Sequence, residues 1–256
     1  MLPKEAKQTA PSVDPDDVAR FNRLGAEWWN PQGPMRALHR FNPARIDYLR
    51  RLLGRRQPRA EGRAAVQAQP LTGLEILDIG CGGGLLSEAL SRLGAKMTAI
   101  DPAPANIDVA RRHAETSGLD IDYLCTTAEA LAAERKSFDV VLAMEVVEHV
   151  RDVDGFIRCA AGMLRPRGIF VAATLNRNLK SYALAILGAE YVLNWVPKGT
   201  HRWAQFVKPR ELAAALRGAD LHVFDETGIV FDPLSGSWRE SRDMDVNYIM
   251  AAERKA

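Results

Sequence analysis

The chain has 256 residues, a length at which one globular domain with a short appendage is sufficient. Hydrophobic residues make up 47% and charged residues 26%, which excludes a globally disordered protein. The formal net charge of +2, from 34 basic and 32 acidic residues, argues against a nucleic acid as the partner.

The cysteines and the amino-terminal residues indicate the cellular compartment in which the protein is located. Cys81, Cys125 and Cys159 are an odd number and form no zinc or disulfide pattern, which favours a reducing environment. The amino terminus lacks an apolar signal region and contains acidic residues that a transit peptide avoids. No apolar run reaches the roughly 18 residues of a spanning helix. We therefore expect a cytoplasmic protein.

The first quarter of the chain predicts helices and a linker. Residues 1–13 are expected to form a flexible tail, and residues 14–53 a helical appendage. Acidic residues that can cap a helix precede Phe21, Leu24 and Trp28, which have helical spacing. Residues 54–72 have few large apolar side chains and are rich in Arg, Ala and Gln, which indicates a linker.

From residue 73 to residue 256 the pattern alternates between strands and helices, which is typical of a parallel α/β domain. We expect strands at residues 74–80, 96–101, 121–125, 138–144, 168–175, 222–230 and 247–254. Helices are expected at residues 85–94, 106–118, 156–164 and 208–219. We expect an inserted lid or membrane-contact segment at about residues 176–203 within this domain.

A glycine-rich loop follows the first of these strands. Gly80, Gly82 and Gly84 lie where an open α/β sheet binds its ligand, and acidic Asp78 precedes them. A dinucleotide fingerprint beginning at Gly80 requires a small residue at position 85, which is Leu85, so a nicotinamide-dependent dehydrogenase is disfavoured.

Asp101 ends the second predicted strand, 21 residues after Gly80. A carboxylate there can accept hydrogen bonds from both ribose hydroxyls of an adenosyl group. The alternative is that the glycines only make a turn and Asp101 only caps the next helix. The agreement between glycine spacing and acid position favours a nucleoside site.

Short motifs along most of the chain carry a closer resemblance. They are W-W-N-P-Q-G-P at 28–34, L-H-R-F-N-P-A-R at 38–45, D-I-G-C-G-G-G at 78–84, M-E-V-V-E-H-V at 144–150, T-L-N-R-N at 174–178, G-A-E-Y at 188–191, V-P-K-G-T-H at 196–201 and D-V-N-Y at 245–248. The glycine loop resembles the nucleoside site of class I methyltransferases. From about Val13 onward the chain resembles the ubiquinone biosynthesis O-methyltransferase family.

This resemblance implies a Rossmann-like class I methyltransferase fold: a mainly parallel seven-stranded sheet with an antiparallel last strand and an N-terminal helical appendage. It implies S-adenosyl-L-methionine as the methyl donor, contacted by Arg45, Gly80, Asp101 and Met144. With Asp78 and Gly82 from the loop, these residues are the predicted cofactor site. The implied reaction is O-methylation of phenol or catechol hydroxyls on polyprenylated ubiquinone precursors, of the 2-polyprenyl-6-hydroxyphenol and 3-demethylubiquinol types.

The segment after the fourth predicted strand supplies candidate catalytic groups. Glu145, Glu148 and His149 are spaced i, i+3, i+4 and share one face if the segment is helical. They can bind a divalent cation such as magnesium, which would lower the pKa of a catechol, and the resemblance supports this role. Alternatively His149 acts alone as a general base, or the cluster is structural.

Residues 179–198 form an apolar stretch with interfacial aromatic residues between Lys180 and Lys198. It can rest on the inner face of a membrane and admit a polyprenyl tail, or it can be a lid that packs only on the protein. A quinone-biosynthesis complex is a further possible partner. Two alternative functions stay open: methylation of another small phenol, and a non-catalytic cofactor-binding scaffold.

Overall fold

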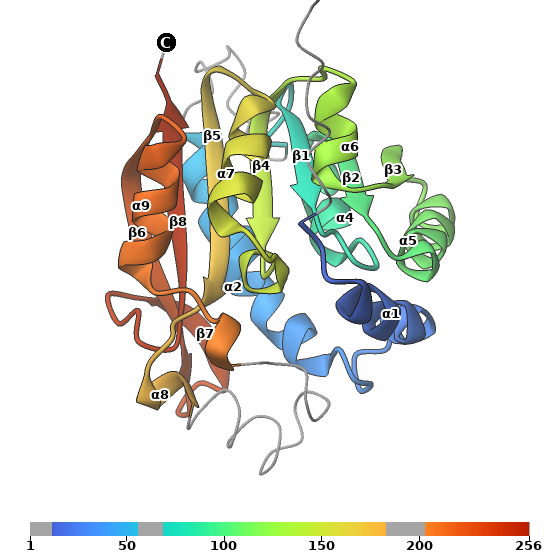
Figure 1. The fold of residues 1–256 in the computed structure, drawn as a ribbon. Coiled ribbons are helices and arrows are strands. Elements are labelled where there is room, and N and C mark those ends of the chain that lie inside the picture. Colours follow the sequence, from blue (N-terminus) through green and yellow to red (C-terminus); the bar gives the residue numbers. More distant parts are fainter. Residues whose placement is uncertain (1–11, 56–68, 183–202, 256) are drawn as a thin grey trace, which may run out of the picture.

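The computed structural model describes residues 12–55, 69–182 and 203–255. Their centre is an eight-stranded sheet in the order β3-β2-β1-β4-β5-β8-β6-β7 (Figure 1). The strands are β1 (Glu75–Ile79), β2 (Lys96–Asp101), β3 (Ile121–Cys125), β4 (Phe138–Met144), β5 (Leu164–Leu175), β6 (Leu221–Asp232), β7 (Ser237–Ser241) and β8 (Asn247–Arg254). The first five strands pair in parallel, and β8 is antiparallel to both β5 and β6.

The predicted sheet is confirmed with one addition. Seven strands were expected, and the described residues contain an eighth, β7, which pairs antiparallel with β6 from Gly228 to Asp232. Strand β6 runs two residues further than expected and turns back through residues 233–236. In this turn Gly236 has a φ of 66° and its N–H donates to the Asp232 carbonyl at 2.9 Å.

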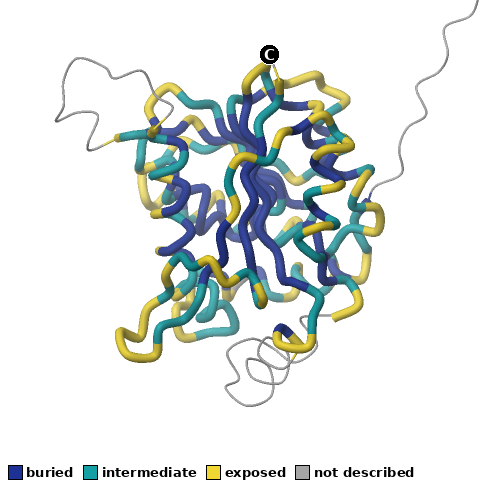
Figure 2. The backbone as a smooth tube through the Cα atoms, turned by 90° about the vertical axis from the view of Figure 1, so that its left-hand side faces the viewer, coloured by how far each residue is buried: buried dark blue, intermediate teal, exposed yellow. Residues whose placement is uncertain are grey.

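Helices cover both faces of the sheet (Figure 1). They are α1 (Pro15–Arg23), α2 (Arg36–Gly54), α4 (Leu85–Arg92), α5 (Pro104–Thr116), α6 (Ala128–Ala133), α7 (Val153–Gly162), α8 (Leu179–Ser181) and α9 (Pro209–Gly218). Leu77 and Val141 point to the face covered by α6, α7 and α9. Ile76 and Val140, one residue away, point to the face covered by α2 and α4. Because side chains on both faces of the sheet are covered, β1 and β4 are buried along almost their whole length, and Figure 2 shows the centre of the sheet coloured as buried.

Helix α1 begins at an aspartate cap, as the sequence indicated. The Asp14 side chain accepts from the Asp16 N–H at 3.0 Å, which satisfies one of the free donors at the helix start. Helix α2 contains Pro43 and buries Tyr48, Leu49 and Leu53 in the same core as the central strands.

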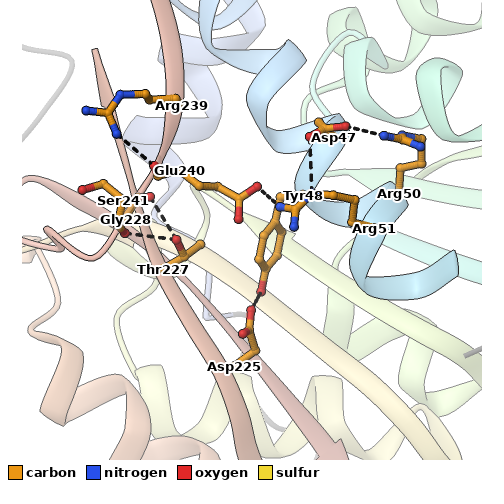
Figure 3. Close-up of polar contacts among 10 residues, drawn as sticks. All are labelled: Asp47, Tyr48, Arg50, Arg51, Asp225, Thr227, Gly228, Arg239, Glu240 and Ser241. Atoms are coloured by element: carbon orange, nitrogen blue, oxygen red, sulfur yellow. Dashed lines mark hydrogen bonds and ion pairs between the residues drawn. The ribbon is translucent and has the colours of Figure 1, made fainter. Parts of the chain in front are cut away.

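Polar contacts join α2 to the β6–β7 hairpin (Figure 3). The Tyr48 hydroxyl donates to Asp225 Oδ2 at 2.7 Å. Arg51 forms an ion pair with Glu240 of β7, and its Nε lies 3.4 Å from Asp47 Oδ2. The hairpin that the sequence did not predict is thus held to the helix that precedes the linker.

Some predicted boundaries and segments lie beyond these residues. The tail at residues 1–13, the linker at 54–72 and the inserted segment at about 176–203 fall wholly or mostly outside the described ranges, so they stay predictions. Within the described ranges, no helix combines the length and apolarity needed to cross a bilayer.

Candidate active site

The loop between β1 and α4 turns on glycines. Gly80 and Gly82 have φ of 72° and 54°, a region that residues with a Cβ rarely adopt. A Cβ on Gly80 would lie 2.5 Å from Val146 Cγ2, and one on Gly82 would lie 2.2 Å from Trp28 Cη2. Backbone conformation and space therefore both require glycine, and the predicted loop is confirmed in its position at the carboxyl end of β1.

Asp101 is held in place by three donors. The Gly82 N–H donates to Oδ2 at 3.0 Å, and the Ala103 N–H and the Asn106 side chain donate to Oδ1 at 2.8 and 3.1 Å. Burial raises the pKa of this carboxyl, and the three hydrogen bonds oppose the shift. The bond to Ala103 lies at the start of α5, so Asp101 stabilises the helix entry and also lines the cavity described below.

Asp78 is a second buried carboxyl behind the loop. Its Oδ2 accepts from the Ser87 hydroxyl at 2.6 Å. Burial raises the pKa of Asp78 to about 6, which the hydrogen bond from Ser87 opposes. A buried acid with this pKa is mostly ionised at neutral pH, and its ionisation lowers the stability of the folded protein. Such a perturbed pKa is typical of residues in functional sites.

Arg45 of α2 points toward the end of β4. Its Nη2 lies 2.5 Å from Glu145 Oε1, and its guanidinium carbon lies 4.4 Å from the ring centroid of Phe41. Arg45 is only 3% exposed, and its Nε has no hydrogen-bond partner among the described residues. A buried donor without a partner suits an anionic ligand group. Met144, the last residue of β4, is buried beside this pair.

The segment after β4 differs from the helical expectation. Glu145 has a φ of 59°, and only Val147–His149 form a 3-10 turn, so the expected shared face of an α-helix is wrong. Glu148 accepts from the Thr174 hydroxyl at 2.8 Å. Its pKa is raised well above the ordinary value by burial and then by the charge of Glu145. The left-handed backbone turns Glu145 toward Arg45 instead.

The His149 side chain contacts helix α1. Its Nδ1 lies 3.0 Å from Asp17 Oδ2 of α1, and its ring meets the Phe21 ring edge to face, with centroids 5.3 Å apart. Glu145, Glu148 and His149 therefore each have a different protein partner. Across the described ranges, no group of three or more His, Cys, Asp or Glu side chains is arranged to hold a metal ion. The donor set does not fit a cation bound by all three predicted ligands.

All predicted site residues nevertheless line one cavity of about 750 Å³ at the carboxyl ends of the strands, a volume in the usual range for small-molecule sites. They are Arg45, Asp78, Gly80, Gly82, Asp101, Met144, Glu145, Glu148 and His149. The same cavity is lined by Asp17, Trp28 and Asn106, which the sequence analysis did not select as site residues. The acidic run that contains Asp17 was interpreted as a helix cap and as evidence against a transit peptide.

Comparisons with known proteins identify the family. A family model described as a methyltransferase domain matches residues 77–172. A ubiquinone biosynthesis O-methyltransferase of Methylocella silvestris is 62% identical over 95% of this chain and 96% of its own length. Proteins of the same name from Methylobacterium sp. (strain 4-46) and Brucella ovis are 54% and 51% identical, over 97% and 96% of this chain and 98% and 97% of their own lengths. The chain belongs to the ubiquinone biosynthesis O-methyltransferase family.

Solved structures place this family member in the expected fold. An S-adenosylmethionine-dependent methyltransferase of Thermotoga maritima, described as a possible histamine N-methyltransferase, superposes with a TM-score of 0.62 at 19% identity. It covers 93% of this chain and 100% of its own. A magnesium protoporphyrin IX methyltransferase of Synechocystis PCC 6803 with bound S-adenosylmethionine gives a TM-score of 0.60 at 18% identity, over 96% and 100% of the two chains.

The predicted family, Rossmann-like fold and S-adenosylmethionine-dependent O-methyl transfer are confirmed for this member of the family. A nicotinamide-dependent dehydrogenase is thereby ruled out. The roles of the individual site residues stay predictions, which the geometry above constrains.

Proposed function

We propose that this O-methyltransferase binds S-adenosylmethionine and a polyprenylated phenol or catechol together in the cavity at the carboxyl ends of β1, β2 and β4, and methylates a ring hydroxyl. One observation carries the proposal. The residues predicted to bind the cofactor's nucleoside and the side chains able to accept a proton line the same cavity of about 750 Å³. The names of the relatives support a ubiquinone precursor as the acceptor.

The chain's residues suit each part of the methyl donor. Asp101 is proposed to accept from the ribose hydroxyls, because three donors already fix its carboxylate. Arg45 is proposed to pair with the donor's carboxylate through its unpartnered, buried guanidinium nitrogen. Gly80 and Gly82 let the backbone approach closely, and Met144 packs an apolar, polarisable side chain beside them.

Activation of the acceptor is assigned to His149. S-adenosylmethionine supplies a methyl group on a sulfonium that is displaced in line. A phenol with a pKa near 10 is protonated at pH 7, and forming the phenolate costs roughly 4 kcal/mol. His149 is proposed to accept the phenol proton on Nε2 as the new O–C bond forms, while Glu145 and Glu148 line the wall beside it.

The competing mechanism is that the same residues bind magnesium or a similar divalent cation, which would activate the acceptor hydroxyl. We favour the general base because Glu145, Glu148 and His149 are held by Arg45, Thr174 and Asp17 respectively. A cation bound by all three would require these contacts to be exchanged. Turnover that a chelator abolishes and magnesium restores would support the cation and overturn the metal-free assignment.

The acceptor's polyprenyl tail is assigned to the apolar side of the cavity. This side is lined by Met35, Leu38, Phe41, Phe231 and Trp238, from the α2 region and the β6–β7 hairpin. The Trp238 ring packs against Phe41 and Phe231 with centroid distances of 5.0 and 5.5 Å. An isoprenoid chain buries apolar surface there while the ring hydroxyl reaches His149.

Peripheral contact with a membrane is proposed for the edge that carries the cavity. Strands β5 and β6 run in the same direction, so the segment after β5 and the turn after β6 lie at one edge. Leu179 is 82% exposed and Leu234 is 98% exposed. Lys180 is ion-paired with Asp243 and Asp245, so the apolar residues carry this proposal. Membership of a quinone-biosynthesis complex is a further proposal, which the names of the relatives support.

The experiment that tests the function is product analysis with a demethylated, prenylated quinol and S-adenosylmethionine. We expect a single O-methylated ring and S-adenosylhomocysteine in equal amounts. The His149→Gln variant should bind S-adenosylmethionine with the parent's affinity and lose most of its turnover. Equal turnover on a non-prenylated catechol would favour another small phenol, and no methylated product with bound cofactor would favour a scaffold.

A further inference from the structure

The strongest unassigned feature of the cavity is the contact between Asp17 and His149. Asp17 Oδ2 lies 3.0 Å from His149 Nδ1, although the two residues are 132 positions apart. Asp17 is only 3% exposed, so its carboxylate has little access to water. Both residues line the cavity. A nearly buried carboxylate that meets one imidazole nitrogen is an arrangement that determines what the other nitrogen does.

The carboxylate imposes one tautomer on the neutral imidazole. An ionised aspartate only accepts hydrogen bonds, so the His149 nitrogen facing it must carry the hydrogen. The lone pair then lies on Nε2. That is the nitrogen able to receive a proton from an acceptor hydroxyl, as in other sites where a carboxylate orients a catalytic histidine.

The orientation of the carboxylate is fixed by a second contact. Arg20 Nη2 lies 3.1 Å from Asp17 Oδ1, one helical turn along α1. The two carboxylate oxygens therefore have different partners, Arg20 on one side and His149 on the other. The Phe21 ring closes on the imidazole at an interplanar angle of 87°, which restricts its rotation.

The backbone before α1 locks this helix to the segment that carries His149. Val13 pairs with Val150 in an antiparallel bridge, and the Arg151 N–H donates to the Ser12 carbonyl at 2.9 Å. The Ser12 N–H donates to Glu129 Oε1 at 3.1 Å. The residues directly after His149 are thus tied to the residues just before Asp17, so the separation of the two side chains is set by backbone hydrogen bonds.

We propose that Asp17 is a positioning residue of the methyl transfer: it holds His149 in the tautomer and orientation that present the Nε2 lone pair to the acceptor hydroxyl. Helix α1 then contributes to turnover as well as to the fold. This inference rests on the proposed role of His149, and it adds a residue that acts through His149 without touching the reacting atoms.

The test compares Asp17→Asn with the parent in steady-state kinetics. An asparagine fits the same space, but its amide can donate to His149 Nδ1 and place the hydrogen on Nε2. We expect kcat to fall at least about tenfold, with KM for the prenylated quinol and the Kd for S-adenosylmethionine within about threefold of the parent. Asp17→Glu, which retains the carboxylate, should recover part of the lost kcat.

A spectroscopic readout separates positioning from folding. In 15N-histidine-labelled protein, assigned by comparison with His149→Gln, the parent should show a protonated Nδ1 and an unprotonated Nε2 at His149. Asp17→Asn should reverse or mix these states. The matched control is Asp14→Ala, which removes the cap of the same helix and a 3.5 Å contact with Arg151 but does not touch His149. It should keep the parent's kcat and 15N pattern.

The outcomes distinguish this inference from the proposed function. If His149→Gln retains turnover, the role of His149 in the proposed function is wrong. If His149→Gln is inactive but Asp17→Asn has the parent's kcat, or leaves the imidazole tautomer unchanged, only the positioning role is wrong. An equal loss of kcat in Asp14→Ala would show that the loss reports loosening of α1, and this would also overturn the proposal.

Discussion

At the scale of single residues, Asp101 combines two roles that the sequence analysis treated as alternatives. It receives hydrogen bonds at the start of α5 and also faces the cavity. We predict that Asp101→Ala weakens S-adenosylmethionine binding by about 1.5–3 kcal/mol, the range for a hydrogen bond to a charged group. Isothermal titration calorimetry measures this, with Asp122→Asn on the exposed surface of β3 as the control. Unchanged affinity in Asp101→Ala would reject the ribose assignment.

The raised pKa of Asp78 predicts that the stability of the protein depends on pH. Its pKa of about 6 in the folded protein lies above the ordinary value of 3.8 because the group is buried. The folded protein therefore holds a proton that the unfolded chain has already released, and stability falls as pH rises from about 4 to about 6. A shift of about two units corresponds to roughly 3 kcal/mol.

The Asp78→Asn variant removes this titration. Its free energy of unfolding should exceed that of the parent increasingly between pH 4 and pH 7, reaching a difference of about 1–3 kcal/mol if the Ser87 contact is kept. Urea denaturation of both proteins across this range gives the difference directly. A difference that does not vary with pH would mean that Asp78 has an ordinary pKa.

The site residues show what spacing can and cannot predict. Asp78, Asp101 and Met144 end or closely precede the ends of parallel strands, and such ends meet at one edge of a sheet, so their proximity followed from the sequence. The directions of Glu145, Glu148 and His149 did not follow, because a left-handed φ at Glu145 breaks the helical spacing. Asp17 was missed because its partner is 132 residues away and no local pattern encodes that contact.

At the scale of elements, the expected helices and strands were found with small shifts at their ends. Helix α5 begins at Pro104, two residues before the apolar pattern, because proline is favourable in the first turn of a helix. Strand β7 was not predicted, because its residues do not show the apolar pattern of a strand. Its sequence, Ser-Trp-Arg-Glu-Ser, is largely polar, since an edge strand buries little of its surface.

The join between α2 and the hairpin gives a stability prediction. Removing the Tyr48 hydroxyl, which donates to Asp225 at 2.7 Å, should lower the free energy of unfolding by about 1–3 kcal/mol. Tyr48→Phe, Asp225→Asn and the double variant form a thermodynamic cycle that urea denaturation can measure. We expect the two single changes to be non-additive and S-adenosylmethionine affinity to remain unchanged. Simple additivity would show that the two groups are not coupled.

At the scale of the whole molecule, the cavity and the exposed apolar residues share one edge of the sheet. Deleting residues 179–198, the predicted membrane-contact segment, should reduce sedimentation with anionic liposomes and leave S-adenosylmethionine affinity nearly intact. Leu234→Ser should reduce sedimentation further, because this side chain is 98% exposed at the same edge. Phe224→Ser is the control, since Phe224 is also exposed but lies near the opposite end of β6. Equal sedimentation of the deletion variant and the parent would leave only the lid interpretation.

The packing of Trp28 on the glycine loop has a practical consequence. Its indole lies so close to Gly82 that a single added carbon would overlap it, and its Nε1–H donates to Asn106, which in turn donates to Asp101. Tryptophan emission responds to the polarity and hydrogen bonding around the ring. The protein therefore carries its own fluorophore at the proposed nucleoside site. Binding of S-adenosylmethionine is then expected to change the emission of unlabelled protein, and Trp28→Phe should abolish this change.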